Sequence, residues 1–464
     1  MDASASELLR SIPSVGEFLD STAGKSLCSE FGVGITKFEL RALLDEIRAQ
    51  IRAGSAAVPD ETRLAADLRT RLIRLTQPIG RRAINATGIL LHTGLGRSPL
   101  CREAVEALTT AGNYSVLQAS LDSGDRSLRE EKIQRMLVEL TGCEAATVVN
   151  NNAAATMLIL NTLAKGKEVI ISRGQLIEIG GSFRMTEVMA QSSAILREVG
   201  TTNRTHLRDY EGAINENTGA IIHVHTSNYR IRGFAGTPDI RELAELGRRR
   251  NLRVIDDLGS GAIVPLHDFG ISDEPLVKDS IAAGADVACF SGDKLICGPQ
   301  AGIICGKKPI IEEIRKNPFA RMFRVCKLTL AGLEATLPHF LNARYRDAIP
   351  FYRMLCRKLE DLAVDAQLVA TGIEEIPGLS VTVADDIAYV GSGAIPDEGI
   401  PTKVVRLTHR DIPPDDLARR LRLGIPSLFG RLQDRHLVLD MRTLLDGETQ
   451  LVIDAVRNAV LQGT

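Results

Sequence analysis

The chain has 464 residues, with 56 Lys and Arg against 58 Asp and Glu and a formal net charge of −2. With 44% apolar and 25% charged residues, this composition excludes a disordered chain, a collagen-like chain and a small disulfide-rich protein. The charge balance also argues against a protein that is a basic nucleic-acid clamp throughout. Aromatic residues make up only 4%, too few for a surface that reads single-stranded bases by stacking.

The cysteines and the first residues indicate the cellular setting. None of the 8 cysteines forms a Cys-x-x-Cys pair, which argues against a zinc ribbon or a thioredoxin-type motif, and no metal site is predicted. The opening MDASASELLR lacks the apolar run of a signal peptide. No apolar stretch reaches the roughly 18 residues that span a bilayer. We therefore expect a cytoplasmic protein with reduced cysteines and no membrane contact.

Residues 1–80 are predicted to be helical. The segment 37–53 (KFELRALLDEIRAQIRA) has an apolar stripe at helical spacing, formed by Leu40, Leu43, Leu44, Ile47 and Ile51. A break and a second helix, ETRLAADLRTRLIRLTQ, follow. Between residues 41 and 82, nine arginines stand against five acidic residues. That excess is typical of a solvated helix face, and a polyanion-binding surface is the alternative.

From residue 81, short apolar runs alternate with helical or turn-rich segments. The predicted strands are ATVVN, KEVIIS, AILREVG, AIIHVHTS, LRVIDDLGSG and VACFSG. This alternation predicts a mostly parallel sheet with helices on both faces, which binds ligands beyond the carboxyl ends of its strands. One helix is predicted to begin at Thr237, with Pro238 in its first turn.

The C-terminal part has a different pattern. Residues 351–369 (FYRMLCRKLEDLAVDAQLV) are predicted to form one helix, and LARRLRLG forms another. The segments GLSVTVADD, KVVRLTHR and HLVLDMRTL alternate like half-buried strands. A smaller α+β domain is therefore predicted. The expected domains are 1–80, 81–340 and 341–464.

Two strand-end motifs carry groups that suit pyridoxal chemistry. The loop FSGDKLICGPQAGII places Lys294 among glycines just beyond a predicted strand. Burial there lowers an ammonium pKa and frees the amine to form an imine, although an isolated SGDK more often marks a surface lysine in a turn. The strand VIDDLGSG ends in Asp256 and Asp257, either of which could pair with a protonated pyridine nitrogen. Side chains alternate across a strand, and we favour Asp257 because Asp-x-Gly leaves room for a planar ring. A Mg²⁺ site is the alternative use of the two acids.

A third motif, VVNNNAAAT, predicts a strand, a polar turn and the start of a helix. Its first amides would form a phosphate cradle, made by Asn151, Asn152, Ala153 and Ala154. An ordinary Asn N-cap is the alternative. A phosphate cradle, a strand-end Asp and a glycine-flanked Lys follow one another in the order of a fold-type-I pyridoxal phosphate (PLP) enzyme, which the sequence resembles.

The resemblance narrows to bacterial selenocysteine synthase, the L-seryl-tRNA(Sec) selenium transferase family. Between about residues 80 and 340 the matching segments are INATGILLHTGLGR, VVNNNAAA, SRGQLIEIGGSFR, EVGTTNRTHLRDY, HTSNYRIRGF, DLGSG, FSGDKLICGPQAG and RVCKLTLAGLEATL. The C-terminal GSGAIPDE and FGRLQDRHLVLDMRTL match more loosely. The N-terminal region fits, in character, that family's tRNA-binding domain.

The resemblance implies conversion of L-seryl-tRNA(Sec) to L-selenocysteinyl-tRNA(Sec) with selenophosphate. It implies that Lys294 holds PLP as an aldimine, that Asp257 meets the ring nitrogen, and that the reaction passes through aminoacrylyl-tRNA. Asp293 is the nearest candidate acid for the leaving hydroxyl. Its alternative is to cap the turn or to pair with a neighbouring base.

The resemblance further implies an anion site for selenophosphate, because arginine recognises phosphate oxygens bidentately. The candidates are Arg97, Arg321 and Arg324, followed by Arg126 and Arg129. Arg321 and Arg324 are spaced i, i+3 and would share one face of a helix. A surface salt bridge is the alternative for each. The tRNA is expected on the helical region 41–82, and the family suggests a ring-like homo-oligomer.

Four positions depart from the family pattern. Cys297 replaces a glycine, Cys326 an aspartate, Ser127 a glycine and Gln175 a glutamate. Cys297 is interpreted as a buried small residue, with a reactive thiol as the alternative. Two other functions stay open: a related PLP-dependent lyase acting on a small amino acid or amino sugar phosphate, and a catalytically silent tRNA-binding homologue. The N-terminal helical region favours the tRNA enzyme over the lyase, and the presence of Lys294 argues against a silent homologue.

Overall fold

A computed structural model describes residues 3–54, 58–78, 80–179, 183–231, 233–271, 274–391 and 398–461. The chain divides into two compact units, Met1–Arg82 and Ala83–Thr464. Most of the GSGAIPDE segment (391–398) and part of SRGQLIEIGGSFR (172–184) lie outside the described residues. Within the described ranges, no helix combines the length and the apolar character needed to cross a membrane.

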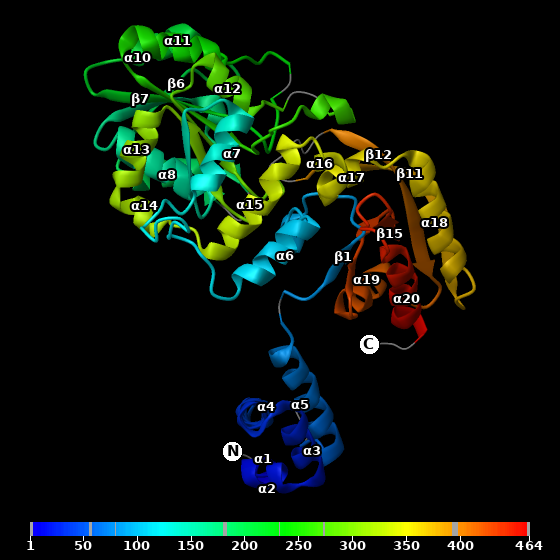
Figure 1. Ribbon diagram of the computed structural model, residues 1–464. Helices are drawn as coiled ribbons and strands as arrows, with labels where there is room; N and C mark the ends of the chain where they lie inside the picture. Colours follow the sequence, from blue (N-terminus) through cyan, green and yellow to red (C-terminus); the bar gives the residue numbers. More distant parts are fainter. Residues whose placement is uncertain are drawn as a thin grey trace. The chain divides into compact units, whose positions relative to one another are not determined.

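The first unit consists of helices, shown in blue in Figure 1. They are α1 (Ala3–Arg10), α2 (Val15–Asp20), α3 (Thr22–Phe31), α4 (Val33–Arg52) and α5 (Glu61–Thr76). The apolar stripe predicted for α4 is buried along its whole length and packs with Leu64, Leu68 and Leu72 of α5. Asp60 begins α5 by accepting a hydrogen bond from the Arg63 amide (2.8 Å), as an N-cap does. The predicted helical N-terminal region is confirmed.

The second unit contains a seven-stranded sheet. In spatial order its strands are β2 (Ala145–Val149), β10 (Gly302–Gly306), β9 (Val287–Ser291), β8 (Arg253–Gly259), β7 (Thr218–Val224), β3 (Glu168–Ser172) and β6 (Ile195–Val199). In this sheet β10 runs antiparallel to both of its neighbours, and the other neighbouring pairs are parallel. The predicted, mostly parallel sheet is confirmed. Strands β2, β9 and β10 are buried on both faces, which explains their near-continuous apolar sequences.

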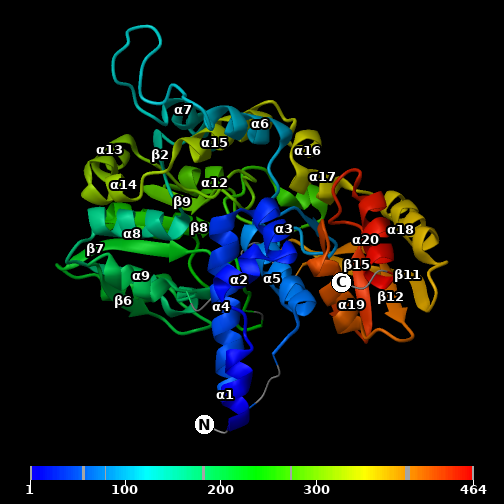
Figure 2. The ribbon, with the colours of Figure 1, turned by 90° about the horizontal axis from the view of Figure 1, so that it is seen from below.

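Helices cover both faces of this sheet (Figures 1 and 2). The alternation of side chains along β9 shows this directly, because Phe290 packs into one core and Cys289 into the other. The core with Phe290 includes α6 (Arg102–Ala111), α7 (Glu131–Thr141), α12 (Val277–Ala283) and α15 (Lys327–Leu341). The core with Cys289 includes α8 (Asn152–Leu163), α9 (Met185–Gln191) and α13 (Lys308–Lys316). Near β6, α10 (Leu207–Ala213) and α11 (Ile240–Arg250) enclose a smaller core.

The C-terminal part forms an α+β layer, as predicted. Its antiparallel sheet has the order β11 (Leu379–Tyr389), β12 (Gly399–His409), β15 (His436–Asp440) and β14 (Arg431–Gln433). Its core is completed by α18 (Leu359–Ile373), α19 (Pro414–Leu423) and α20 (Glu448–Leu461). Strand β1 (Ala83–Asn85) pairs in parallel with β13 (Ser427–Phe429) and buries Ile84 in this same core. The domain limits 1–80, 81–340 and 341–464 stay a prediction.

Two local predictions are wrong. Residues 351–369 are not one helix, because α17 (Pro350–Cys356) ends before Arg357 and α18 begins at Leu359. Arg357 has extended backbone, and its guanidinium donates to the Met441 carbonyl (2.6 Å). Helix α11 begins at Ile240 rather than at Thr237, because Asp239 and Glu242 form a reciprocal capping box.

Candidate active site

Seven of the residues singled out in the sequence line one cavity of about 360 Å³ in the second unit. They are Arg97, Asn151, Asn152, Ala153, Asp257, Asp293 and Lys294. We call this the lysine cavity. It lies where β7, β8 and β9 end and where α8 begins, the edge at which open parallel sheets bind ligands.

Asp257 faces the lysine cavity from β8 and is 1% exposed. Its Oδ1 accepts from Asn152 Nδ2 (2.8 Å) and from the Gly259 amide (3.1 Å), and its Oδ2 accepts from the Thr156 hydroxyl (2.8 Å). Burial raises the pKa of this carboxyl group, and these hydrogen bonds oppose the rise. A protonated ring nitrogen beside it would likewise favour the ionised form.

Asp256, the neighbouring acid, points to the opposite face. Its carboxylate contacts His223 Nδ1 (2.8 Å) and accepts from the Ser280 hydroxyl (2.5 Å). Because the two carboxylates of β8 lie on different faces, they do not converge on one Mg²⁺ ion.

The start of α8 presents amides to the cavity. Asn151 is the N-cap, and its Oδ1 accepts from the Ala154 amide (2.9 Å). Ala154 is thereby used within the helix and does not line the cavity, whereas Asn152 and Ala153 do. A Cβ added to Gly302 of β10 would lie 2.1 Å from the Asn151 carbonyl oxygen, so glycine lets this strand pass close to the turn. The N-cap interpretation therefore applies to Asn151, and a phosphate cradle formed by the amides of Asn152 and Ala153 stays a prediction.

Lys294 lies just beyond β9 and is 7% exposed. Burial lowers its pKa below the ordinary 10.5, and the nearby positive charge of Arg97 lowers it further. Asp293 and Asp257 oppose this shift. The net result is an amine that is more readily neutral than a surface lysine, as imine chemistry requires.

Asp293 and Arg97 form an ion pair at the rim of the cavity. Arg97 Nη1 donates to Asp293 Oδ2 over 2.6 Å. The second oxygen, Oδ1, is buried and has no hydrogen-bond partner among the described residues. A polar atom in this position is normally satisfied by a ligand or a water molecule. The pairing with a neighbouring base, one of the alternatives for Asp293, is present.

Arg321 and Arg324 do not line the lysine cavity. They line a separate cavity of about 230 Å³, together with Arg129 and Arg315. We call this the arginine cavity. Val149 lines it and Asn151 lines the lysine cavity, so the two cavities flank the same connection between β2 and α8.

The expectation that Arg321 and Arg324 share a helix face is wrong. Helix α14 (Pro318–Met322) ends before Arg324, which instead forms a β-bridge with Val149. Burial and the charge of Arg324 lower the pKa of Arg129. Arg126 is exposed and lines neither cavity.

Sequence reasoning missed several residues of the lysine cavity. His225 and Ser227 follow β7 and line it, and Gln300 approaches from the loop before β10. His225 donates its backbone amide to the Asp257 carbonyl (2.8 Å), and its Nε2 lies 3.3 Å from Glu274. The available signal was the polar sequence HTSN directly after an apolar strand, at the same sheet edge as Asp257.

Two of the departures from the family pattern have a structural account. Cys297 is fully buried with φ +59°, a conformation that favours glycine, and its thiol donates to the Lys294 carbonyl (3.2 Å). Burial raises the thiol pKa of Cys297 far above its ordinary value, which supports a buried small residue over a reactive thiol. Gln175 is buried, and its Oε1 accepts from the Val224 amide (3.1 Å).

These features fit PLP. The α8 amides suit its phosphate, the buried Asp257 suits its ring nitrogen, and the buried amine of Lys294 suits its aldehyde. The unsatisfied Asp293 Oδ1 in the cavity is a polar atom that a bound group can satisfy.

Comparisons with known proteins agree with the family resemblance of the sequence. Residues 83–445 match the family described as L-seryl-tRNA selenium transferase. Proteins named L-seryl-tRNA(Sec) selenium transferase from Desulfovibrio desulfuricans and Solidesulfovibrio magneticus are 44% and 46% identical to the chain. The first alignment covers 98% of both chains, and the second covers 97% of this chain and 98% of its relative. The relative of that name from Carboxydothermus hydrogenoformans is 42% identical over 95% of this chain and 96% of its own.

Among solved structures, D-glucosaminate-6-phosphate ammonia-lyase has a similar fold. The TM-score is 0.58 at 22% identity, covering 83% of this chain and 99% of that chain. At this level of identity the likeness concerns the fold alone. The predicted fold-type-I class is confirmed.

Proposed function

Because the chain belongs to the L-seryl-tRNA selenium transferase family, we propose that it converts L-seryl-tRNA(Sec) to L-selenocysteinyl-tRNA(Sec), with selenophosphate as selenium donor and PLP as cofactor. Relatives of that name share 42% to 46% identity with it over nearly the whole chain. The observation that carries the proposal is the convergence of Lys294, Asp257 and the start of α8 on one cavity.

Three groups would hold the cofactor. Lys294 would bind it covalently through Nζ, Asp257 would pair with its ring nitrogen, and the amides of Asn152 and Ala153 would bind its phosphate. When bound, PLP supplies an electron sink, which lets a proton leave the seryl Cα and a hydroxyl leave Cβ. Asn152 has a second task, because its side chain orients Asp257.

Proton movement would fall to Lys294 and Asp293. The pKa of Lys294 is lowered chiefly by burial, so its amine can accept the proton from Cα. Asp293 Oδ1, the oxygen that Arg97 does not contact, could hold the proton that the leaving hydroxyl needs. Arg97 would keep the Asp293 carboxyl group oriented through Oδ2.

The arginine cavity is our candidate for the phosphate group of selenophosphate. Arg315 is already engaged, since it donates to Gln134 (2.7 Å) and to the Ala146 carbonyl (2.6 Å). This leaves Arg129, Arg321 and Arg324 as the groups suited to bidentate binding of an anion. Arg97 is the corresponding candidate within the lysine cavity, and the role of Arg126 stays a prediction.

The helical first unit is our candidate for the tRNA contact. Three of its arginines pair with acidic side chains: Arg48 with Asp45, Arg69 with Glu30, and Arg71 with Glu46. The acidic partners partly neutralise these three arginines, so the surface that can attract a polyanion is smaller than the arginine count indicates. Recognition of a folded tRNA by backbone and shape needs few aromatic residues, in keeping with the composition.

The proposal also covers the oligomeric state and the cellular location of the protein. A homo-oligomer follows from the family resemblance, and a ring would place several helical units around one tRNA-binding assembly. A cytoplasmic location follows from the substrate, because aminoacyl-tRNA is made and used there.

The other two candidate functions are less favoured. The ammonia-lyase has a similar fold at 22% identity, whereas the transferase relatives share about twice that identity over both units. A catalytically silent homologue is less favoured because Lys294 and Asp257 are both buried in the same cavity and Asn152 donates a hydrogen bond to Asp257.

The proposal is tested by incubating the PLP-loaded chain with seryl-tRNA(Sec) and selenophosphate and identifying the aminoacyl group by mass spectrometry. Selenocysteine on the tRNA is the expected product. Unconverted serine in a sample that shows the cofactor absorption band would contradict the proposal and favour the lyase. Parallel reactions with free serine and with an amino sugar phosphate test the lyase directly.

A further inference from the structure

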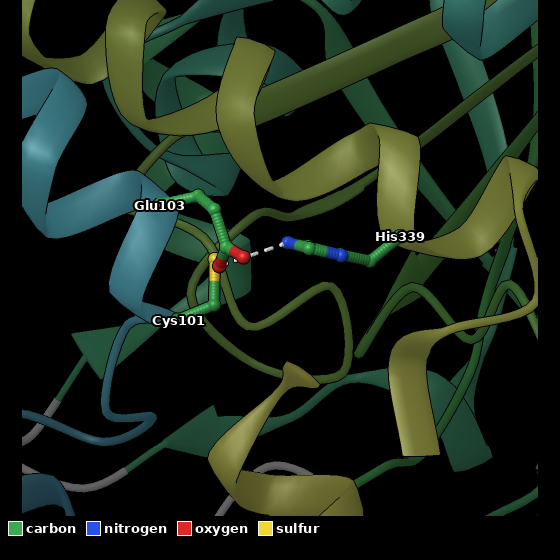
Figure 3. Close-up of side chains that lie close together, drawn as sticks. All are labelled: Cys101, Glu103 and His339. Carbon is green, nitrogen blue, oxygen red and sulfur yellow. Dashed lines mark ion pairs between the residues drawn. The ribbon is translucent and has the colours of Figure 1, made fainter. Parts of the chain in front are cut away.

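A cluster of three side chains lies outside the groups used above, where α6 meets α15 (Figure 3). Cys101 is the N-cap of α6, Glu103 lies in the first turn of that helix, and His339 lies in the last turn of α15. Their potential ligand atoms, Cys101 Sγ, a Glu103 carboxylate oxygen and a His339 ring nitrogen, all lie within 4.8 Å of one another. Thiolate, carboxylate and imidazole are the three kinds of ligand that zinc takes from proteins.

The state of His339 is the first indication of a ligand. Its side chain is 9% exposed, and its Nε2 is buried without a hydrogen-bond partner among the described residues. Glu103 Oε2 lies 3.3 Å from this nitrogen, but the contact does not have hydrogen-bond geometry. That separation is about the distance between a nitrogen and an oxygen ligand on one tetrahedral zinc ion, whose bonds are about 2.0–2.1 Å long.

Cys101 gives the second indication. It is fully buried, and its sulfur lies beside the Glu103 carboxylate (Figure 3). Thr336 Oγ1 is 3.9 Å from this sulfur and donates to the Gly332 carbonyl (2.8 Å), so it can accept a weak hydrogen bond from the Cys101 thiol. A zinc ion between the sulfur and the carboxylate would be bound by both groups, with the sulfur as a thiolate.

We propose that Cys101, Glu103 and His339 bind a zinc ion, with a water molecule completing the tetrahedron. Binding displaces the thiol proton, and the thiolate and carboxylate together neutralise the divalent charge. The thiolate ligand selects zinc over magnesium, calcium or manganese, which prefer oxygen ligands.

The zinc ion would crosslink two helices. It would join the start of α6 to the end of α15, and the segment that enters α6 is the one that carries Arg97, the partner of Asp293. Fixing Cys101 and Glu103 would therefore hold the entry to the lysine cavity in place. The spacing of the three ligands along the chain matches no zinc-ribbon pattern, because the third ligand comes from a distant helix. The proposal does not depend on the reaction that the lysine cavity performs.

The test measures zinc in the full-length, PLP-loaded chain. After incubation with zinc chloride and gel filtration, we expect about one zinc per chain by elemental analysis. Cys101→Ser and His339→Gln should lose this zinc while keeping the cofactor absorption band, which reports on folding. Cys326→Ser and His267→Gln, at an exposed cysteine and a histidine side chain that is 75% exposed, are matched controls and should keep it.

Cobalt substitution adds a readout of the ligands. Co²⁺ in the wild-type chain should show the visible bands of a tetrahedral site with thiolate ligation, and Cys101→Ser should abolish them. Equal zinc in Cys101→Ser and the wild type, or zinc lost equally from the two control variants, would show adventitious surface binding and would overturn the proposal. So would a folded wild-type chain that retains no zinc after filtration.

Discussion

The lysine cavity and the arginine cavity flank one connection, but they balance their charges differently. In the lysine cavity, Asp257 receives three hydrogen bonds, and Asp293 is paired with Arg97. In the arginine cavity, Glu130 is the acid among lining residues that include four arginines. The first arrangement is organised before a ligand arrives. The second keeps a positive potential that an anion would neutralise.

The largest expected effect concerns the lysine cavity. Lys294→Ala should lower selenium transfer on the order of 10³-fold or more, because the covalent anchor and the proton-accepting amine are lost together. Loss of the cofactor absorption band and of product formation are the measurements. Lys278→Ala, at an exposed lysine of α12, is the control. An unchanged band in Lys294→Ala would refute the assignment.

The next effect distinguishes the two acids of β8. Asp257→Asn keeps the shape of the side chain but removes the charge that a protonated ring nitrogen requires, so kcat should fall roughly 10²-fold. Asp256→Asn changes the other face, where His223 and Ser280 are the partners. It should affect thermal stability more than kcat. The reverse pattern in steady-state kinetics would mean that Asp256 serves the cofactor.

Substitutions in the arginine cavity should change the KM for selenophosphate rather than kcat. Each charged hydrogen bond contributes about 1.5–3 kcal/mol, so Arg321→Ala combined with Arg324→Ala should raise the KM for selenophosphate about 10-fold or more. The cofactor band should not change. Arg102→Ala, at a side chain that is 87% exposed and paired with Glu106, is the control. A double variant with an unchanged KM would remove this cavity from the donor site.

A pH profile tests the lysine cavity without a mutation. Burial and Arg97 lower the pKa of Lys294 below 10.5, so at any lower pH a larger fraction of its amine is neutral than in a free lysine side chain. The rate at which the cofactor-free chain binds PLP should rise with pH and reach its midpoint below 10.5. Nα-acetyl-lysine gives the reference profile. A midpoint at or above the reference would contradict the account.

The smallest effect concerns the start of α8. Asn151→Ala removes the cap and should cost about 1 kcal/mol of stability, together with a modest loss of PLP affinity. Asp60→Ala removes the corresponding cap of α5 in the first unit. It should cost a similar amount without changing PLP affinity. Thermal unfolding and PLP titration of both variants test the difference, and equal losses of PLP affinity would contradict it.

The sequence predicted the site residues whose positions depend only on the strands of the sheet and on where those strands end. Lys294 and Asn152 follow strands β9 and β2, and Asp257 lies near the end of β8. The carboxyl ends of parallel strands meet at one edge of a sheet. The alternation rule allowed only one of Asp256 and Asp257 to face the pocket, and the Asp-x-Gly pattern favoured Asp257. The contacts of the two side chains agree with this choice.

What the sequence could not predict depends on contacts between distant segments. The break at Arg357 arises where its guanidinium meets the Met441 carbonyl, far away in the chain. The separation of Arg321 and Arg324 from the lysine cavity follows from the end of α14 and a bridge to Val149. Local spacing predicted a shared helix face but carried no information about which cavity that face would meet.

The central claim is that the lysine cavity activates the seryl group and the arginine cavity binds selenophosphate. Two measurements on the wild type, on Lys294→Ala and on the Arg321→Ala, Arg324→Ala double variant test it most directly. Exchange of the seryl Cα proton with deuterated water, without selenophosphate, reports on the lysine cavity, and selenium transfer reports on both. We predict that Lys294→Ala loses exchange and transfer, whereas the Arg321→Ala, Arg324→Ala double variant keeps exchange and loses transfer at low selenophosphate. Equal loss of exchange in the double variant would contradict the account.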